Sequence, residues 1–133
     1  MIDVNCNYHD ENAQVVNHQY QVKTYDELKE AINQYPWHHE IEQFEQSGEG
    51  GGITLSKQQD EFVIVSYLLV PIDFDVASLD VDVRLSRGWL GFIGGKSVSY
   101  SYPPLSYKDA LGILKEIVDS SVEHLYQQYR LKK

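Results

Sequence analysis

Four aspartates flank a short dipeptide at alternating positions and are the residues best placed to bind a ligand. Asp73 and Asp75 alternate with apolar residues before the Ala-Ser dipeptide at 77–78, and Asp80 and Asp82 alternate in the same way after it. If that dipeptide is a two-residue hairpin turn, Asp75 faces Asp80 and Asp73 faces Asp82 on one sheet face. Like charges directly opposite each other destabilise a sheet, so we expect something outside the fold to use these pairs.

Two ligands suit such carboxylates: a basic protein surface and a hard cation such as Ca²⁺. The spacing D-x-D-x-D-G, which is typical of calcium loops, is absent from the sequence. A solvated sheet face or edge, where charge guards against aggregation, is the alternative that needs no ligand. We therefore predict no metal site and no cofactor, while the partner surface and the solvated face both stay open.

A second group of carboxylates, between residues 40 and 49, directly precedes the glycine run at 50–52. Glycine lets another chain approach the backbone closely, so the group and the run could form one binding surface. A flexible turn with a bulge beside a solvated sheet face is the alternative. The predicted partner-binding residues are the carboxylates of both groups: Glu40, Glu42, Glu45, Glu49, Asp73, Asp75, Asp80 and Asp82.

The other chemistry-bearing residues form no catalytic motif. Gly94-Gly95-Lys96-Ser97 resembles the end of a phosphate-binding loop, but Leu90 stands where that motif requires glycine. His38 and His39 are adjacent, so on a strand they would point to opposite faces and could not chelate one ion together. The single cysteine, Cys6, excludes an internal disulfide and a cysteine-based zinc site. We predict that the chain is not an enzyme.

The apolar periodicity predicts the elements that would position these residues. A capping box at 24–27 begins a short helix over 25–34, and a long helix is expected over 107–129. Strands are predicted at 15–23, 37–46, 53–56, 62–70, 72–76, 79–85, 89–93 and 97–102, with a hairpin turn at Gly94-Gly95. Residues 1–13 are expected to be a loose arm.

The segment 37–46 is ambiguous, because Trp37, Ile41 and Phe44 have helical spacing but the segment leads straight into glycines, which favours a strand. We expect an α+β fold in a single domain, 1–133. Its antiparallel meandering sheet would have five to six strands, with the short N-terminal helix and the long C-terminal helix packed on one face.

Charge is unevenly distributed along the chain. Residues 1–82 hold 16 carboxylates and three lysines, a net charge of −13, whereas residues 83–133 carry +4, for a total of −9. Concentrated negative charge favours a basic protein partner and repels phosphate backbones, so no nucleic-acid partner is expected.

Tyr25, Tyr35 and Tyr107 are among the tyrosines that no core pattern requires. An aromatic anchor ringed by carboxylates would suit a basic partner with a cleft.

The N-terminal residues 1–5 lack the basic region and apolar core of a signal peptide. The longest apolar run, from Phe62 to Pro71, is too short to span a bilayer. A single cysteine also fits a reducing compartment. We therefore expect a cytoplasmic protein without a membrane partner.

The predicted architecture resembles the immunity proteins of bacterial toxin–antidote systems, including contact-dependent inhibition and type VI secretion. The resemblance rests on the helix over 25–34, the segment 41–55 around the glycine run, the strand 62–70, and the closing helix after Pro103-Pro104. It implies a protein that binds its cognate toxin and blocks the active site or a substrate surface. Many such toxins are basic nucleases, which an acidic antidote matches electrostatically.

The sequence therefore predicts a cytoplasmic inhibitor that neutralises a basic secreted toxin by a protein–protein interaction and has no chemistry of its own. An acidic nucleic-acid mimic that inhibits a DNA-processing enzyme is one alternative. A small ligand-binding or enzymatic α+β domain, with residues assembled only in three dimensions, is the other.

Overall fold

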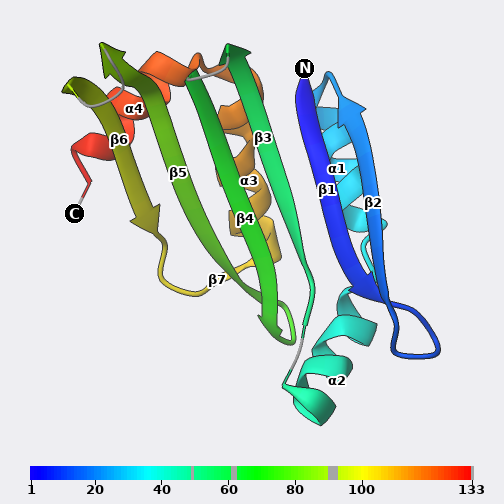
Figure 1. The fold of residues 1–133 in the computed structure, drawn as a ribbon. Helices are drawn as coiled ribbons and strands as arrows, with labels where there is room; N and C mark the ends of the chain where they lie inside the picture. The colour runs from blue at the N-terminus through cyan, green and yellow to red at the C-terminus, as the bar shows by residue number, and fades with distance from the viewer. Residues whose placement is uncertain (49, 61–62, 90–92, 133) are drawn as a thin grey trace.

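The computed structural model describes residues 1–48, 50–60, 63–89 and 93–132 (Figure 1). Within these ranges the chain forms seven strands and four helices. In chain order they are β1 (Ile2–His9), β2 (Val15–Val22), α1 (Tyr25–Asn33), α2 (Trp37–Ser47), β3 (Gly52–Asp60), β4 (Val63–Asp73), β5 (Val76–Trp89), β6 (Ile93–Ser101), β7 (Leu105–Ser106), α3 (Tyr107–Asp119) and α4 (Val122–Arg130).

The strands form one sheet in the order β2-β1-β3-β4-β5-β6, with β7 beside β5, and every described pair is antiparallel. Figure 1 shows α1, α3 and α4 behind one face of the sheet, with α2 at one end and the opposite face uncovered. The predicted α+β class with an antiparallel sheet is confirmed. The sheet has seven described strands, however, and not five to six.

The core lies between the sheet and the helices behind it. Alternate residues of the inner strands point into this layer, as the period of two along a strand requires. The helices contribute residues spaced three or four apart, which form one apolar stripe on each helix. The largest fully buried apolar side chains are Leu28, Ile32, Ile53, Leu55, Tyr67, Leu69, Leu79, Leu114, Ile117, Leu125 and Tyr129.

The loose arm predicted over residues 1–13 is wrong, because β1 occupies most of it and lies inside the sheet between β2 and β3. Ile2, Val4 and Cys6 point into the core. The residues between them are aspartate or asparagine, which are depleted in strands and conceal the alternation. Pairing on both edges of β1 overrides that weak local preference.

The hairpin turn predicted at 77–78 is also wrong. The turn between β4 and β5 lies at Phe74 and Asp75, and Asp73 pairs with Val76. Asp75 adopts a left-handed φ of 55°, which aspartate tolerates far better than most residues. Ala77 is fully buried in β5, so it continues the strand and does not turn.

This register removes the predicted stacked acidic pairs. Asp80 lies opposite Leu68 on β4, and Asp82 lies opposite Ser66. The hydroxyl of Ser99 on β6 donates a hydrogen bond to Asp82. The two aspartates of β5 are therefore accommodated by uncharged neighbours, and no repulsion between cross-strand carboxylates needs to be explained.

The hairpin turn predicted at Gly94-Gly95 is wrong as well, because both glycines lie within β6 and Gly94 pairs with Gly88. Residues 90–92, which join β5 to β6, lie outside the described residues. Lys96 and Ser97 continue the strand, so the segment has the strand geometry that argued against a phosphate-binding loop.

The segment 37–46, for which a strand was favoured, forms the helix α2, so the helical spacing of Trp37, Ile41 and Phe44 decides its structure. The helix ends at Gly48, whose φ is 76° and whose N–H donates to the carbonyl of Phe44 at 2.8 Å. A left-handed glycine is a common helix C-cap. Glycine is equally common in turns between strands, which is why the sequence alone favoured a strand here.

The long helix predicted over 107–129 is two helices, α3 and α4. Ser120 has an extended backbone, and the side chain of Ser121 caps α4 by accepting the N–H of His124 at 3.1 Å. Lys57 Nζ donates to the carbonyls of Ile117 at 3.1 Å and Ser120 at 2.8 Å. The lysine on β3 thus satisfies carbonyls that the end of α3 leaves free.

Hydrogen-bonded tyrosines join α4 to α3 and to Tyr102, the residue that follows β6. Tyr129 donates from its hydroxyl to Glu116 Oε1 at 2.6 Å, and the Tyr102 hydroxyl lies 2.7 Å from that of Tyr129. Burial raises the pKa of Tyr129, and the hydrogen bond to Glu116 raises it further. Burial likewise raises the pKa of Tyr67 and of Tyr102.

We expect these tyrosines to make the fold sensitive to alkali. The unfolded chain loses its phenolic protons near the ordinary pKa of about 10, whereas the folded chain holds them to higher pH. The free energy of unfolding, measured with urea, should therefore decrease as the pH rises past about 10. The decrease should be smaller in Tyr129→Phe, and an equal decrease in both proteins would contradict this account.

Candidate functional site

Three segments meet at one end of the sheet and are called the α2 end here: residues 9–15, 36–48 and 70–77. Figure 1 shows α2 at the same end as the turn between β4 and β5. The rings of His38 on α2 and Phe74 in that turn lie 5.3 Å apart. His39 Nε2 lies 3.3 Å from the carbonyl oxygen of Asp10 in the turn between β1 and β2. Side chains of α2 therefore contact both turns.

A buried carboxylate attaches α2 to the sheet. Glu40 is 0% exposed, and its Oε2 accepts the backbone N–H of His9 at 3.0 Å. Its Oε1 accepts the N–H of Gly51 at 3.0 Å and lies 2.9 Å from Nδ1 of the buried His9 ring. Glu40 was predicted to contact a partner, and this is wrong: on a helix its side chain turns inward and ties the end of β1 to the start of β3.

Gly51 is needed for the close packing of this junction. A Cβ atom on Gly51 would lie 1.9 Å from the carbonyl oxygen of Asn7, which also accepts the hydroxyl of Tyr35 at 2.6 Å. The close approach that the glycine run suggested is thus made at Gly51 by the chain's own β1.

We expect Glu40→Gln to lower the free energy of unfolding by about 2–4 kcal/mol, because an amide offers only one acceptor atom to three donors. Urea unfolding monitored by circular dichroism measures the change. The matched control is Glu42→Gln, which makes the same replacement at an exposed position of the same helix. It should change stability by less than about 0.5 kcal/mol. Equal effects at both positions would refute the role of Glu40.

We expect Gly51→Ala to lower the free energy of unfolding by about 3 kcal/mol, since β1 or β3 must move to admit the methyl group. The control is Gly112→Ala in α3, where a new Cβ meets nothing within 4 Å. That change should stabilise the protein by about 0.5–1 kcal/mol, the helix preference of alanine over glycine. A Gly51→Ala protein as stable as the wild type would contradict the observed packing.

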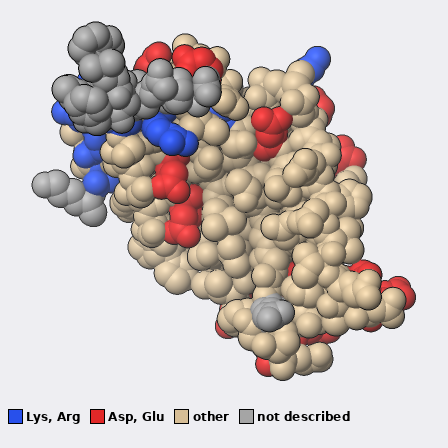
Figure 2. Space-filling view, in the orientation of Figure 1, with Lys and Arg blue, Asp and Glu red and all other residues tan. Residues whose placement is uncertain are grey.

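Five of the eight predicted carboxylates lie at the α2 end, and all of them except the buried Glu40 are exposed. Glu42 and Glu45 are exposed on α2, and Asp73 and Asp75 are exposed at the turn between β4 and β5. The three segments of this end contain no lysine or arginine. Figure 2 shows carboxylates fringing this lower end, while most of the visible lysine and arginine atoms lie toward the opposite end.

Two of the remaining predicted carboxylates lie outside the α2 end. Asp80 and Asp82 are on the uncovered face of the sheet, which Figure 2 shows to be mostly without charged residues. Asp80 is partly buried and Asp82 is exposed. Glu49 lies outside the described residues. The surface predicted as one acidic face is therefore divided between the α2 end and the sheet.

Exposed apolar side chains share the α2 end with the acids. Phe74 is 68% exposed at the tip of its hairpin, directly between Asp73 and Asp75. The other exposed large apolar residues of this end are Val15, Phe44 and Ile72. Exposed apolar groups bordered by polar ones are typical of protein interaction sites.

A slot lies between α2, the tip of the β4–β5 hairpin and the start of α3. Its volume is about 360 Å³, and its lining is mostly apolar, from Trp37, His38, Ile41, Phe74, Asp75 and Tyr107. The Tyr107 hydroxyl is buried and has no hydrogen-bond partner among the described residues. Burial raises the pKa of Tyr107 to about 12, with smaller effects from the charges of Asp75 and Asp73. We call this the aromatic slot.

Sequence reasoning marked Tyr107 as a tyrosine without a core role but missed the slot itself. Trp37 was assigned to a strand, and Phe74 was placed inside a strand and not at a turn. The aspartates on both sides of Phe74 were the available signal, because aspartate is favoured in turns and tolerates the left-handed φ that Asp75 adopts.

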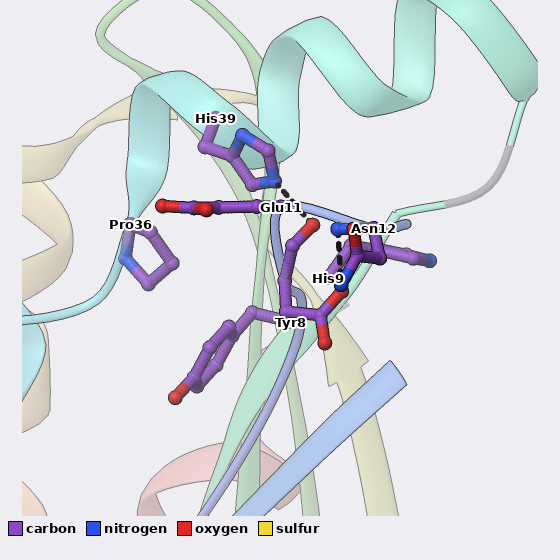
Figure 3. A pocket seen from close by; sticks show the side chains of 7 residues that line it. Tyr8, His9, Glu11, Asn12, Pro36 and His39 are labelled. Atoms are coloured by element: carbon purple, nitrogen blue, oxygen red, sulfur yellow. Dashed lines mark hydrogen bonds between the residues drawn. The ribbon is translucent and has the colours of Figure 1, made fainter. Parts of the chain in front are cut away.

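Figure 3 shows a second hollow, of about 440 Å³, in which side chains including Tyr8, Pro36 and His39 surround the opening. One of its two lining carboxylates has a local role, because Asp10 Oδ1 accepts the N–H of Asn12 at 2.8 Å and that of Gln14 at 3.0 Å. Among the described residues, no group of three or more His, Cys, Asp or Glu side chains is arranged to hold a metal ion.

None of the helices in the described ranges is long and apolar enough to cross a membrane. Comparisons of the chain with known protein families, with curated proteins and with solved structures found no match.

Proposed function

We propose that this protein is an immunity protein that binds and neutralises a cognate, basic, secreted bacterial toxin through its α2 end. The observation that carries the proposal is Phe74, exposed between Asp73 and Asp75 and next to the aromatic slot. A large apolar group framed by carboxylates matches a partner whose cleft is apolar at its base and cationic at its rim.

Charge supports the proposal because it sets both the encounter and the choice of partner. The α2 end combines exposed carboxylates on α2 and at the hairpin tip with segments that lack lysine and arginine. Such a field accelerates association with a cationic protein and slows it with an anionic one. Toxins that cleave nucleic acids need a cationic cleft, which this surface would occupy in place of substrate.

The aromatic residues of the α2 end also support the proposal, because they provide contact area at little cost in conformational entropy. Phe74 and the slot-lining Trp37 and Tyr107 belong to residue types that provide rigid contact area at interfaces. Their contribution is expected mainly in the dissociation rate, while the carboxylates act on the association rate. In this proposal the protein acts by occlusion in the cytoplasm and needs no catalytic group of its own.

A nucleic-acid mimic that blocks a DNA-processing enzyme remains the alternative proposal. It would need carboxylates spaced like phosphates along an extended surface. Figure 2 shows only scattered charged atoms on the uncovered sheet face, and the exposed carboxylates of the α2 end lie beside exposed apolar groups. These observations favour a compact, anchored protein interface.

We expect the tagged chain to capture a basic toxin domain from its own organism, and Asp73→Asn/Asp75→Asn to associate with it about tenfold more slowly at low salt. The matched control is Asp80→Asn/Asp82→Asn, which removes the same charge from the uncovered face. Surface plasmon resonance at two salt concentrations separates the two variants. Equal association rates for both variants would exclude the α2 end as the contact surface, and capture of a DNA-processing enzyme would favour the mimic.

A further inference from the structure

The aromatic slot is built from two pairs of rings. The rings of Trp37 and Tyr107 lie 4.4 Å apart at 40°, and those of His38 and Phe74 lie 5.3 Å apart at 45°. Ile41 completes the apolar part of the lining. The slot is therefore a short recess between ring systems, at the lower end of the size range of ligand pockets.

The polar atoms of the slot suit a donor that carries positive charge. Asp75 lines the slot, and Asp73 lies two residues away at the same hairpin tip. None of the six lining residues is lysine or arginine. The Tyr107 hydroxyl oxygen is buried without a partner among the described residues, so it is free to accept a hydrogen bond.

Three kinds of side chain could enter such a recess, and they differ in what they leave unsatisfied. An aliphatic or aromatic side chain would cover the Asp75 carboxylate without donating a hydrogen bond to it, which costs free energy. Lysine supplies charge but no plane to stack. Arginine supplies a planar cation that stacks on aromatic rings, and its five donors can reach a carboxylate and a hydroxyl together.

We propose that the aromatic slot binds the side chain of an arginine on the partner protein, with the guanidinium stacked among the rings and hydrogen-bonded to Asp75 and the Tyr107 hydroxyl. This inference rests on the proposed function, because the arginine belongs to the basic partner. Its contact with the slot would fix the position of the partner on the α2 end. Arginine is enriched among the residues that dominate interface energies, which fits that assignment.

The test uses the ¹⁵N-labelled full chain and needs no partner. The chain is titrated with N-acetyl-arginine amide and, separately, with N-acetyl-citrulline amide, which has nearly the same shape but no charge. Arginine amide should cause saturable shifts in the Trp37 indole N–H and the amides of Phe74 and Asp75. Citrulline amide should bind more weakly by at least about two- to fivefold, the factor of an exposed cation–π contact.

Two variants locate the effect. Asp75→Asn removes the charge and keeps the turn, since asparagine accepts a left-handed φ, and it should weaken arginine binding by about two- to fivefold. Asp80→Asn/Asp82→Asn should leave binding unchanged. Unshifted resonances elsewhere in the Asp75→Asn spectrum establish that this variant is folded.

Several results would overturn the inference: no saturable shift up to the solubility of arginine amide, equal binding of citrulline amide, or tighter binding of lysine amide. The outcome is separable from that of the proposed function. Toxin capture without arginine binding would keep the α2 end as an interface and remove the arginine contact. Arginine binding without any captured basic partner would keep a cation-binding slot and remove the immunity function.

Discussion

The α2 end depends on one buried carboxylate. Burying an ionised group costs several kcal/mol unless donors replace its water, and Glu40 meets the N–H groups of His9 and Gly51 and the His9 ring. Those donors come from the end of β1 and the approach to β3, so the helix that carries Glu40 has a fixed position on the sheet. The position of the helix in turn brings Trp37 and His38 to the hairpin tip, where the slot forms. An interaction hidden inside the fold thus sets the geometry of the exposed surface.

Local chemistry predicted the elements whose signals are strong and self-contained. The helix α1 follows from its capping box, since Thr24 accepts the N–H of Glu27 as expected, and β4 follows from its run of β-branched and aromatic residues. The helical structure of α2 could not be predicted in this way, because a glycine such as Gly48 is common both at the end of a helix and in a turn between strands. The strand β1 was not predicted because its segment is rich in Asp and Asn. It is a strand only because it pairs with β2 on one edge and β3 on the other.

The candidate site was predictable as composition but not as geometry. Acidic residues dense in sequence indicated a charged surface, and four exposed ones do meet at one end. Which four could not be known, because a shift of the hairpin turn by three residues moves Asp73 and Asp75 to the tip and leaves Asp80 and Asp82 on the sheet. The rings that line the slot lie on α2, at the tip of the β4–β5 hairpin and at the start of α3. These segments are far apart in the sequence, so no spacing of residues could have predicted that they meet.

The place of β1 in the sheet has a consequence for how the chain acquires its structure during synthesis. Its hairpin with β2 is local and can form early, but its other edge waits for β3, whose residues pair with it as far along as Ser56. Until then the nascent chain presents one bare strand edge, a state that is open to pairing with other chains. This exposure ends once residues 51–56 have left the ribosome, because their pairing with β1 covers the edge and also brings the Gly51 N–H to Glu40.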